Sequence, residues 1–484
     1  MSSLFSSLQL LITLCLFLAC ENNADVELTF NPSDNSTDTG EDILTPQLEE
    51  ESFGSLLFEE TTLRGATAGD YFGCAISTGD IDGDGNDEIL AGAYGHDQNG
   101  IHSGAAYLFS QPFDHDNAIV FVGPEPKDHA GMQVLLSPDI SGDQRADIII
   151  SAPYNKNIYI FRSQSIPMLS SVISLDEADH IIIGENAGDY IGWSLSSVSD
   201  IDGDGNHELL IGADGVDYGS FSGGMTYLLF SQTLEVETRF NIEIANRKFV
   251  GDQPLDNAGQ AVSSGDIDGD GLGDIIIGAD GNDSGAENGG AVFINYGAGL
   301  MPADLPLSIS DVILYSQAPF TEAGSSLASG QDANGDGYDD ILIGAPAPER
   351  QSQSPGYVFF IAGGNISSQI LEDAPLQFVG NYDNTGYSVN FVKDIDQDDR
   401  ADILIGAPML HSDTQGGRSY FWPSHTLSSG SVHVAQSPYA FVNEEQRARA
   451  GMSVGSLQYD DQSLLLVGSP QEQHTGSVSI LRIE

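Results

Sequence analysis

Short apolar runs alternate with acidic, glycine-rich turns along most of this chain. Runs such as DEILAGA, ADIIISA and DDILIGA are nearly continuous in Ile and Leu and end in Gly-Ala or Ser-Ala. A variable loop follows each, then a run such as AAYLF or MTYLLF, and then one such as IVFVG or QFVG. Apolar runs of this length between turn residues are typical of buried β-strands. The pattern therefore predicts an all-β chain.

The same series of runs recurs seven times. The motifs that close the second run begin at Gly92, Ser151, Gly212, Gly278, Gly344, Gly406 and Gly468, with spacings of 59 to 66 residues. Four short strands in each period, separated by Gly-rich turns, are typical of one blade of a β-propeller. The sequence therefore predicts a seven-bladed β-propeller of four-stranded antiparallel blades over residues 56–484.

The two ends of this region predict how the ring closes. The chain stops after SVSILRI, the third strand of unit seven, and the segment from Leu56 to Gly65 supplies a candidate for the missing fourth strand. Pairing the N- and C-terminal strands in blade 7 would remove the open edges of the array.

An acidic loop joins the first two strands of four units. DIDGDGNDE, DIDGDGNHE, DIDGDGLGD and DANGDGYDD carry oxygen donors at positions 1, 3, 5 and 9 and a Gly at position 6, as a cation with six to eight oxygen ligands requires. The expected ligands, with a main-chain carbonyl at position 7, are Asp80, Asp82, Asp84, Asn86 and Glu88; Asp200, Asp202, Asp204, Asn206 and Glu208; Asp266, Asp268, Asp270, Leu272 and Asp274; and Asp332, Asn334, Asp336, Tyr338 and Asp340.

Position 12 of these loops lies in an apolar run, so they are β-hairpin loops and not EF-hands. An acidic turn without an ion is the alternative, but crowded carboxylates repel one another. We expect Ca²⁺ in all four loops, with Mg²⁺ as the second choice because it demands a tighter octahedron.

Three further units depart from this loop pattern. DIDQDDRAD keeps its carboxylates, so a fifth site is expected at Asp394, Asp396, Asp398, the Arg400 carbonyl and Asp402. DISGDQRAD, from Asp139, has Ser141 in place of a ligand Asp and Arg145 beside the site, so the cation of the arginine is expected to replace the metal. Unit seven has only four residues, 459–462, between its strands and is expected to bind no metal.

Three recurring features resemble the FG-GAP repeats of the integrin α-chain N-terminal propeller. They are the pairs Phe72-Gly73 and Ile191-Gly192, the DxDGDGxxD/E loops and the GAP endings. The resemblance covers residues 56–484. It implies one ring of seven blades, with calcium in the loops on one face and partners on the opposite face. Similar propellers occur in many bacterial surface proteins.

The first twenty residues carry an apolar stretch from Leu8 to Cys20 that fits a secretory signal peptide. Its Ala19-Cys20 end resembles the lipobox of bacterial lipoproteins, which implies lipidation of Cys20. Residues 21–55 are rich in Asp, Glu, Asn, Ser and Thr and predict a flexible acidic linker. We expect an exported protein at the cell envelope or outside the cell, with a lipid anchor as its only tie to a membrane.

The charge balance limits the possible partners. Fifteen Lys and Arg against 72 Asp and Glu give a formal net charge of −57, which repels nucleic acid and anionic membrane surfaces. The loops opposite the acidic loops place Tyr71, Tyr94, Tyr190, Tyr218 and Tyr382 beside several Asp residues. Aromatic and acidic groups together suit a cationic protein partner or a glycan.

One enzyme signature occurs, the G-x-S-x-G sequence GMSVG around Ser453. Its repeat position places Ser453 in a first strand, whereas a nucleophile elbow needs a strand-to-helix turn. The expected function is therefore binding or adhesion to an extracellular protein, without catalysis. A lectin-like glycan binder is the alternative, and a hydrolase the third.

Overall fold

The computed structural model describes residues 55–56, 58–113, 117–142, 145–166, 171–217, 221–297, 303–347, 355–409, 416–460 and 462–483. The predicted signal peptide, with Cys20, and residues 21–54 of the predicted linker lie outside the described residues. Among the helices that the structure describes, none combines the length and the apolar character needed to cross a membrane.

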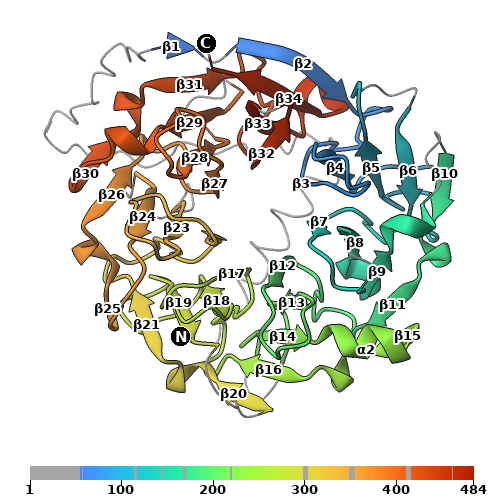
Figure 1. Cartoon of the computed structure of the whole chain (residues 1–484), viewed down its shortest axis with the longest axis horizontal. Coiled ribbons are helices and arrows are strands. Elements are labelled where there is room, and N and C mark those ends of the chain that lie inside the picture. The colour runs from blue at the N-terminus through green and yellow to red at the C-terminus, as the bar shows by residue number, and fades with distance from the viewer. Residues whose placement is uncertain are drawn as a thin grey trace, which may run out of the picture. The chain divides into compact units, whose positions relative to one another are not determined.

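Seven sheets form a closed ring of blades (Figure 1). The four antiparallel strands of blades 1 to 4, from the inside of the ring outward, are β3 (Ile76–Gly79), β4 (Glu88–Ala93), β5 (Ala105–Phe109) and β6 (Ile119–Val122); β7 (Val134–Ser137), β8 (Asp147–Ala152), β9 (Asn157–Phe161) and β11 (His180–Ile183); β12 (Ser194–Val198), β13 (Glu208–Ala213), β14 (Met225–Leu229) and β16 (Arg247–Val250); β17 (Ala261–Gly265), β18 (Asp274–Ala279), β19 (Ala291–Asn295) and β21 (Val312–Tyr315). Those of blades 5 to 7 are β22 (Ser326–Ala328), β23 (Ile341–Ala345), β24 (Tyr357–Ile361) and β26 (Leu376–Val379); β27 (Ser388–Val392), β28 (Asp402–Ala407), β29 (Arg418–Trp422) and β31 (Tyr439–Val442); β32 (Ser453–Tyr459), β33 (Gln462–Ser469), β34 (Ser477–Arg482) and β2 (Phe58–Arg64). The predicted seven-bladed, all-β propeller is confirmed.

Six of the sheets contain a fifth strand, so the prediction of four strands per blade was incomplete. This strand is parallel to the outermost strand and, in blades 1 to 5, comes from the connection between the third and fourth strands of the next blade. In chain order of the blades that they join, the fifth strands are β10 (Ser171–Ser174), β15 (Arg239–Asn241), β20 (Asp304–Pro306), β25 (Gln369–Ile370), β30 (Gly430–His433) and β1 (Ser55–Leu56). Each blade boundary that has one is thereby crossed by main-chain hydrogen bonds.

Helical structure in the described residues is confined to short turns between strands. The one α-helix among them is α2 (Ser231–Val236). The 3-10 turns are η1 (Pro153–Asn155), η2 (Ser163–Ser165), η3 (Leu175–Glu177), η4 (Ile242–Ile244), η5 (Leu307–Ile309), η6 (Leu371–Asp373), η7 (Ser424–Thr426), η8 (Val434–Gln436) and η9 (Glu472–His474).

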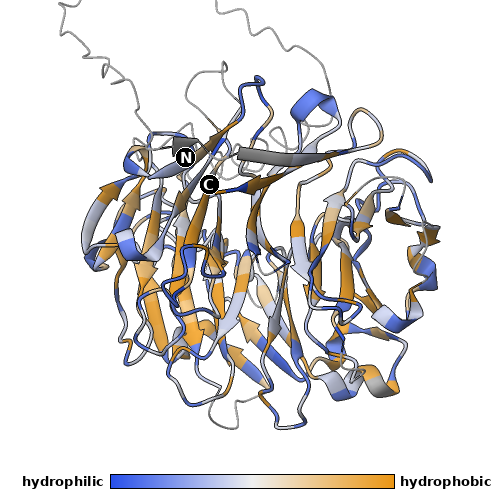
Figure 2. Cartoon of the chain, turned by 45° about the horizontal axis from the view of Figure 1, so that its top comes forward, coloured by the Kyte–Doolittle hydropathy of each residue, from blue (hydrophilic) through white to orange (hydrophobic). Residues whose placement is uncertain are grey.

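The hydrophobic core lies between neighbouring blades. The described residues form seven hydrophobic clusters, one for each of the seven interfaces between blades. Every residue of β4, β8, β13, β18 and β28 is buried, because both faces of these strands pack against other blades. Apolar residues accordingly run along the strands, while the connecting loops are mostly hydrophilic (Figure 2).

The N-terminal segment closes the ring as the sequence predicted. β2 pairs antiparallel with β34 in six registers, from Phe58 opposite Arg482 to Arg64 opposite Ser477, with an irregularity between Glu59 and Thr61. β1, just before it, pairs with β31 of blade 6. The innermost strands β3 and β32 of blades 1 and 7 also contact each other. The segment thus takes the place that a connection and a fourth strand take in the other blades.

The glycines of the two recurrent motifs meet between blades. A Cβ atom added at Gly92, Gly278 or Gly406 would lie 2.1 Å from the carbonyl oxygen of Gly131, Gly324 or Gly451, which belongs to the next blade. At these positions a larger residue would push the two blades apart. Blade 2 has Ser151 at the equivalent position, so the close approach accounts for the Gly of the motif in the blades that have one.

Candidate functional site: the acidic loops and the opposite face

The acidic loops fold so that their carboxylates converge. In blade 3, the Asp200 carboxylate accepts hydrogen bonds from the main-chain N–H groups of Gly203 at 2.6 Å and Gly205 at 2.9 Å. The carboxylates of Asp202 and Asp204 accept from main-chain N–H groups two residues further on. Blades 1, 4 and 5 repeat most of these bonds, as expected for one loop design. Local hydrogen bonds therefore hold the predicted ligand side chains in one turn.

The acid at position 9 lies at the buried base of each loop. Glu88, Glu208, Asp274 and Asp402 begin β4, β13, β18 and β28, and Asp340 directly precedes β23. One oxygen of each accepts a hydrogen bond from the main-chain N–H at position 2, as Glu208 does from Ile201 at 2.9 Å. These acids couple the loop to the strand that crosses the core.

Burial of these acids makes an uncompensated negative charge costly. Burial, opposed by the hydrogen bond from Ile201 and reinforced by the neighbouring Asp carboxylates, raises the pKa of Glu208 to about 8. The same causes raise the pKa of Glu88 to about 7. The pKa of Asp274 and that of Asp340 are raised to about 7, and that of Asp402 to about 6, again mainly by burial.

The structure brings most of the predicted carboxylate ligands within reach of one ion. Ligand atoms lie within 4.8 Å of one another in four groups: Asp80, Asp82 and Glu88; Asp200, Asp202, Asp204 and Glu208; Asp266, Asp268 and Asp274; and Asp394, Asp396 and Asp402. Glu208 Oε1 and Asp266 Oδ1 are shielded from water and have no hydrogen-bond partner, as expected for oxygens that could ligate a cation. The donor set is made of carboxylates and suits a hard divalent cation.

The loops of blades 5 and 2 differ from this arrangement. In blade 5, the Asn334 side-chain amide donates to Asp340 Oδ1 at 2.8 Å, so an amide stands where the other loops have a second carboxylate. In blade 2, the hydroxyl of Ser141 donates to Asp147 Oδ1 at 3.1 Å. One oxygen of the acid at the base of this loop therefore accepts a hydrogen bond from a hydroxyl group. Residues 143 and 144 of that loop lie outside the described residues.

Residues at positions 7 and 8 contact the loop of the preceding blade. The main-chain N–H groups of His207, Asp339 and Ala401 donate to the carbonyl oxygens of Asp139, Asp266 and Asp332. The ring of Tyr338 lies over Gly269, and the guanidinium of Arg400 lies over Gly335. The acidic loops of adjacent blades therefore support one another around this face of the ring.

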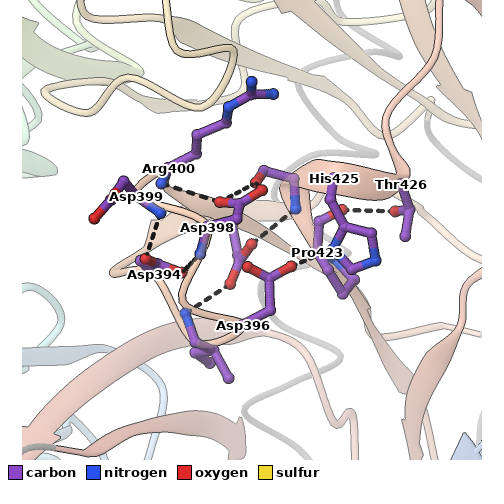
Figure 3. A network of polar contacts seen from close by, with 11 residues as sticks. Asp394, Asp396, Asp398, Asp399, Arg400, Pro423, His425 and Thr426 are labelled. Atoms are coloured by element: carbon purple, nitrogen blue, oxygen red, sulfur yellow. Dashed lines mark hydrogen bonds and ion pairs between the residues drawn. The ribbon is translucent and has the colours of Figure 1, made fainter.

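Sequence analysis missed a second group of residues that touches two of the loops. In blade 3, Ser231 Oγ donates to Asp204 Oδ2 at 2.5 Å, and Gln232 Nε2 donates to Asp202 Oδ2 at 3.4 Å. In blade 6, the equivalent residues are Ser424 and His425 (Figure 3). Their common offset from the end of the third strand is the signal that could have identified them.

The opposite face carries a row of aromatic side chains over blades 1 to 3, which we name the aromatic arc. Tyr71 stacks on Tyr94 with ring centroids 4.8 Å apart. The row continues through His129 and Tyr154, 4.5 Å apart, to Tyr190 and Trp193, 5.9 Å apart. It joins three of the predicted tyrosines, whereas His129, Tyr154 and Trp193 were not predicted. Of the other two, Tyr382 is 46% exposed in blade 6, and Tyr218 lies outside the described residues.

An acidic arc follows on blades 3 to 5 of the same face. It consists of Asp214, Asp280 and Glu322, which are half-buried in the loops after β13 and β18 and before β22. Burial, then the charge of Asp280, raises the pKa of Asp214 to about 8 and that of Glu322 in the same direction. Asp214 Oδ1 is shielded from water without a hydrogen-bond partner. The arc therefore brings together three carboxyl groups whose ionisation is costly by themselves and would be favoured by a nearby cation.

Ser453 has a structural contact that recurs around the ring. Its hydroxyl donates to the carbonyl oxygen of Gly73 at 2.8 Å. Ser194, Ser326 and Ser388 make the same bond to the next blade, at 2.8 to 2.9 Å. The serine of the G-x-S-x-G sequence thus makes one of four equivalent hydrogen bonds between neighbouring blades.

Parts of this chain are similar in sequence to known proteins. The family described as FG-GAP repeat matches residues 191–229, 258–294, 323–359 and 385–422, and a second family of the same description matches residues 62–109. Integrin alpha-PS2 of Drosophila melanogaster is 30% identical over 220 residues, 44% of this chain and 15% of the relative. Human phosphatidylinositol-glycan-specific phospholipase D is 32% identical over 231 residues, 45% of this chain and 27% of the relative. The alignments thus cover less than a third of each relative.

Proposed function

We propose that this chain, an integrin-alpha-like FG-GAP β-propeller, is an exported calcium-binding module that recognises a cationic segment of a protein partner through the face opposite its acidic loops. The observation that carries the proposal is the combination of the aromatic arc and the acidic arc on one face. Aromatic rings attract cations through their faces, and carboxylates without a counterion favour a cationic ligand.

Calcium has a structural task in this proposal. The converging carboxylates of the acidic loops and the unpartnered oxygens of Glu208 and Asp266 support occupation by a divalent cation. Asp80, Asp82, Glu88 and their counterparts in the other blades would hold it. A bound ion would offset the burial and, to a smaller degree, the repulsion that raise the pKa values of the basal acids, and it would brace the first two strands of each blade that holds one.

The test is binding of a basic peptide rich in Arg and Lys, measured by titration calorimetry in calcium at physiological salt. The Asp280→Asn/Glu322→Gln variant is expected to weaken binding by at least about tenfold, because charged contacts that are partly desolvated contribute most. The matched control is Glu243→Gln/Asp304→Asn, which removes two charges from exposed positions at the outer edge. Equal weakening by the two double variants would show that the peptide responds only to the net charge of the chain, which would contradict the proposal.

Two further measurements on the same protein distinguish the alternative functions. Saturable, calcium-dependent binding on a glycan array, lost on Tyr94→Ala, would favour a lectin, since aromatic rings also stack on sugars. Turnover of a phosphatidylinositol-glycan would favour a hydrolase, a test suggested by the similarity to the phospholipase D. The recurrent bond of Ser453 to the next blade argues against this serine as the nucleophile of such a hydrolase.

A further inference from the structure

The acidic loop of blade 6 keeps the shape of the other loops although its sequence has changed. Gln397 and Asp399 stand where the intact loops have glycine, yet both adopt φ of 64°. Asp394 still accepts hydrogen bonds from the main-chain N–H groups of Asp398 and Asp399, at 3.0 and 2.7 Å. Its carboxylates therefore converge like those of a metal-binding loop.

A histidine from a different element of the same blade reaches into this loop. His425 lies in η7, after β29, and its Nδ1 contacts Asp396 Oδ2 (Figure 3). Its neighbour Ser424 fixes the turn, because the Ser424 hydroxyl donates to both oxygens of Asp398, at 3.0 and 2.8 Å, and its main-chain N–H donates to Asp402 Oδ1 at 2.8 Å. The imidazole is thus positioned by three hydrogen bonds of the residue before it.

Asp396, Asp398 and His425 form a mixed group of oxygen and nitrogen donors. One ligand atom of each lies within 4.8 Å of the others. Asp396 Oδ1 is shielded from water and has no hydrogen-bond partner, although the side chain is 19% exposed. The guanidinium of Arg400 points away from this group, toward Gly335 of blade 5, and does not fill it (Figure 3).

Comparison of the blades shows that the imidazole is specific to blade 6. The residue pair Ser424-His425 corresponds to Ser231-Gln232 in blade 3, where Gln232 contacts Asp202 as His425 contacts Asp396. Counted from the strand pairing, blade 2 has Ser163-Gln164 at this position, blade 1 has Gln111-Pro112, and blade 5 has Gly363-Gly364. The same position of the connection therefore carries an amide, a proline, a glycine or an imidazole, depending on the blade.

The ligand type decides which cation such a loop prefers. Calcium and magnesium take oxygen ligands, whereas imidazole suits zinc and related first-row transition metals. Two carboxylates and one imidazole match the three protein ligands of an open zinc site, and the 59% exposure of His425 leaves room for water as a further ligand. We propose that Asp396, Asp398 and His425 form a site for a zinc-class divalent ion, distinct in metal preference from the acidic loops of the other blades.

The test compares zinc binding by the full chain and by two reciprocal variants, each saturated with calcium. His425→Gln recreates the Ser-Gln pair of blades 2 and 3, and Gln232→His places an imidazole on the loop of blade 3. Titration calorimetry is expected to show one zinc ion per wild-type chain, at least about tenfold weaker binding to His425→Gln, and a second zinc ion on Gln232→His. Cobalt bound to the wild type should give visible absorption bands that His425→Gln loses.

Two controls separate this site from other causes. His474→Gln removes an exposed imidazole from η9 and should leave zinc affinity unchanged. Unfolding of His425→Gln in calcium should match that of the wild type, which excludes misfolding. Equal zinc affinity of the wild type and His425→Gln would overturn the proposal and make the contact between His425 and Asp396 an ion pair only. Complete displacement of zinc by calcium would overturn it as well.

Discussion

At the scale of single residues, the repeats show how one position serves different tasks. The residue before the Ala-Gly, Phe-Gly, Ile-Gly or Thr-Gly pair has φ between 51° and 59° in all seven blades. Its identity nevertheless varies: Tyr71, His129, Tyr190, Asn257, Glu322, Asn384 and Arg449. Because the backbone is held by the fold and the side chain is free to vary, this position can set the chemistry of the face opposite the acidic loops.

His129 makes the stability of the folded chain sensitive to acid. Burial, and to a lesser degree the charges of His102 and Lys127, lowers its pKa from 6.5 to about 4. Between these values the unfolded chain binds more protons than the folded chain, so stability falls as pH drops from about 6.5 to about 4, by on the order of 3 kcal/mol. Above pH 6.5 this contribution is complete.

The variant His129→Asn should flatten that part of the pH dependence. Asn257 and Asn384 occupy the equivalent position with nearly the same φ, so the backbone is expected to tolerate the change. Urea unfolding of both proteins between pH 4 and pH 7.5 measures the difference. Parallel stability curves across this range would show that His129 does not titrate as described.

At the scale of elements, neighbouring blades are held together at their glycines. Gly278 lies in β18, and an added Cβ atom would sit 2.1 Å from the carbonyl oxygen of Gly324. Gly278→Ala should therefore reduce the free energy of unfolding by about 3 kcal/mol, the upper end of overpacking effects in cores.

Gly455 provides a matched control within the same ring. It lies in β32, and the nearest atom to an added Cβ is Ile76 Cγ2 at 3.8 Å. Gly455→Ala should change the free energy of unfolding by less than about 1 kcal/mol. Denaturant titrations of the two variants measure the free energies of unfolding. Similar losses of stability in both variants would mean that the close approach of the blades does not cause the destabilisation of Gly278→Ala.

The closing segment is the second prediction at this scale. Deleting residues 56–64 removes β2 and half of β1, exposes the edge of β34 and opens the core cluster that contains Leu63. We expect a lower melting temperature and concentration-dependent association, because an unpaired strand edge is a template for pairing. Calorimetry and light scattering measure the two effects. A deletion of residues 1–50 leaves both strands intact and serves as control; if both deletions melt like the parent, the closure contributes nothing to stability.

At the scale of the whole molecule, the proposed calcium binding by the acidic loops would link the ion to the stability of the ring. Each occupied site would add roughly 1.4 kcal/mol when free calcium is about ten times its dissociation constant, and several sites would act together. Excess EDTA should therefore lower the melting temperature, and calcium should restore it.

Glu208→Gln identifies the contribution of one loop to this effect. Glutamine keeps an acceptor for the N–H of Ile201 but carries no charge, and ionising the buried Glu208 at neutral pH is costly. In EDTA at pH 8 the variant should melt at or above the wild-type temperature, and it should gain less from calcium. Glu243→Gln, at an exposed position in η4, is the control that should follow the wild type. A variant that gains as much from calcium as the wild type would rule out Glu208 as a ligand.

The repeat pattern by itself determined the fold of this protein. Seven copies of an apolar run, each ending in Gly-Ala or a close variant, specify seven blades, because a strand buried on both faces must be apolar throughout and its terminal glycine must admit the next blade. The carboxylates of each loop are close in the sequence, so their convergence followed from spacing alone. The closing strand could also be predicted from the sequence, because the C-terminal unit lacks a fourth strand and the segment from Leu56 to Gly65 supplies a candidate for it.

The tertiary structure alone decided which distant residues meet. The fifth strands, the contacts between loops of adjacent blades and the aromatic arc join segments from different repeats, and sequence spacing carries no information about such neighbours. His425 reaches Asp396 only because η7 folds back over the loop that precedes β28. The scaffold was therefore readable from local periodicity, whereas the chemistry of its two faces depends on contacts between blades and connections that only the closed ring brings together.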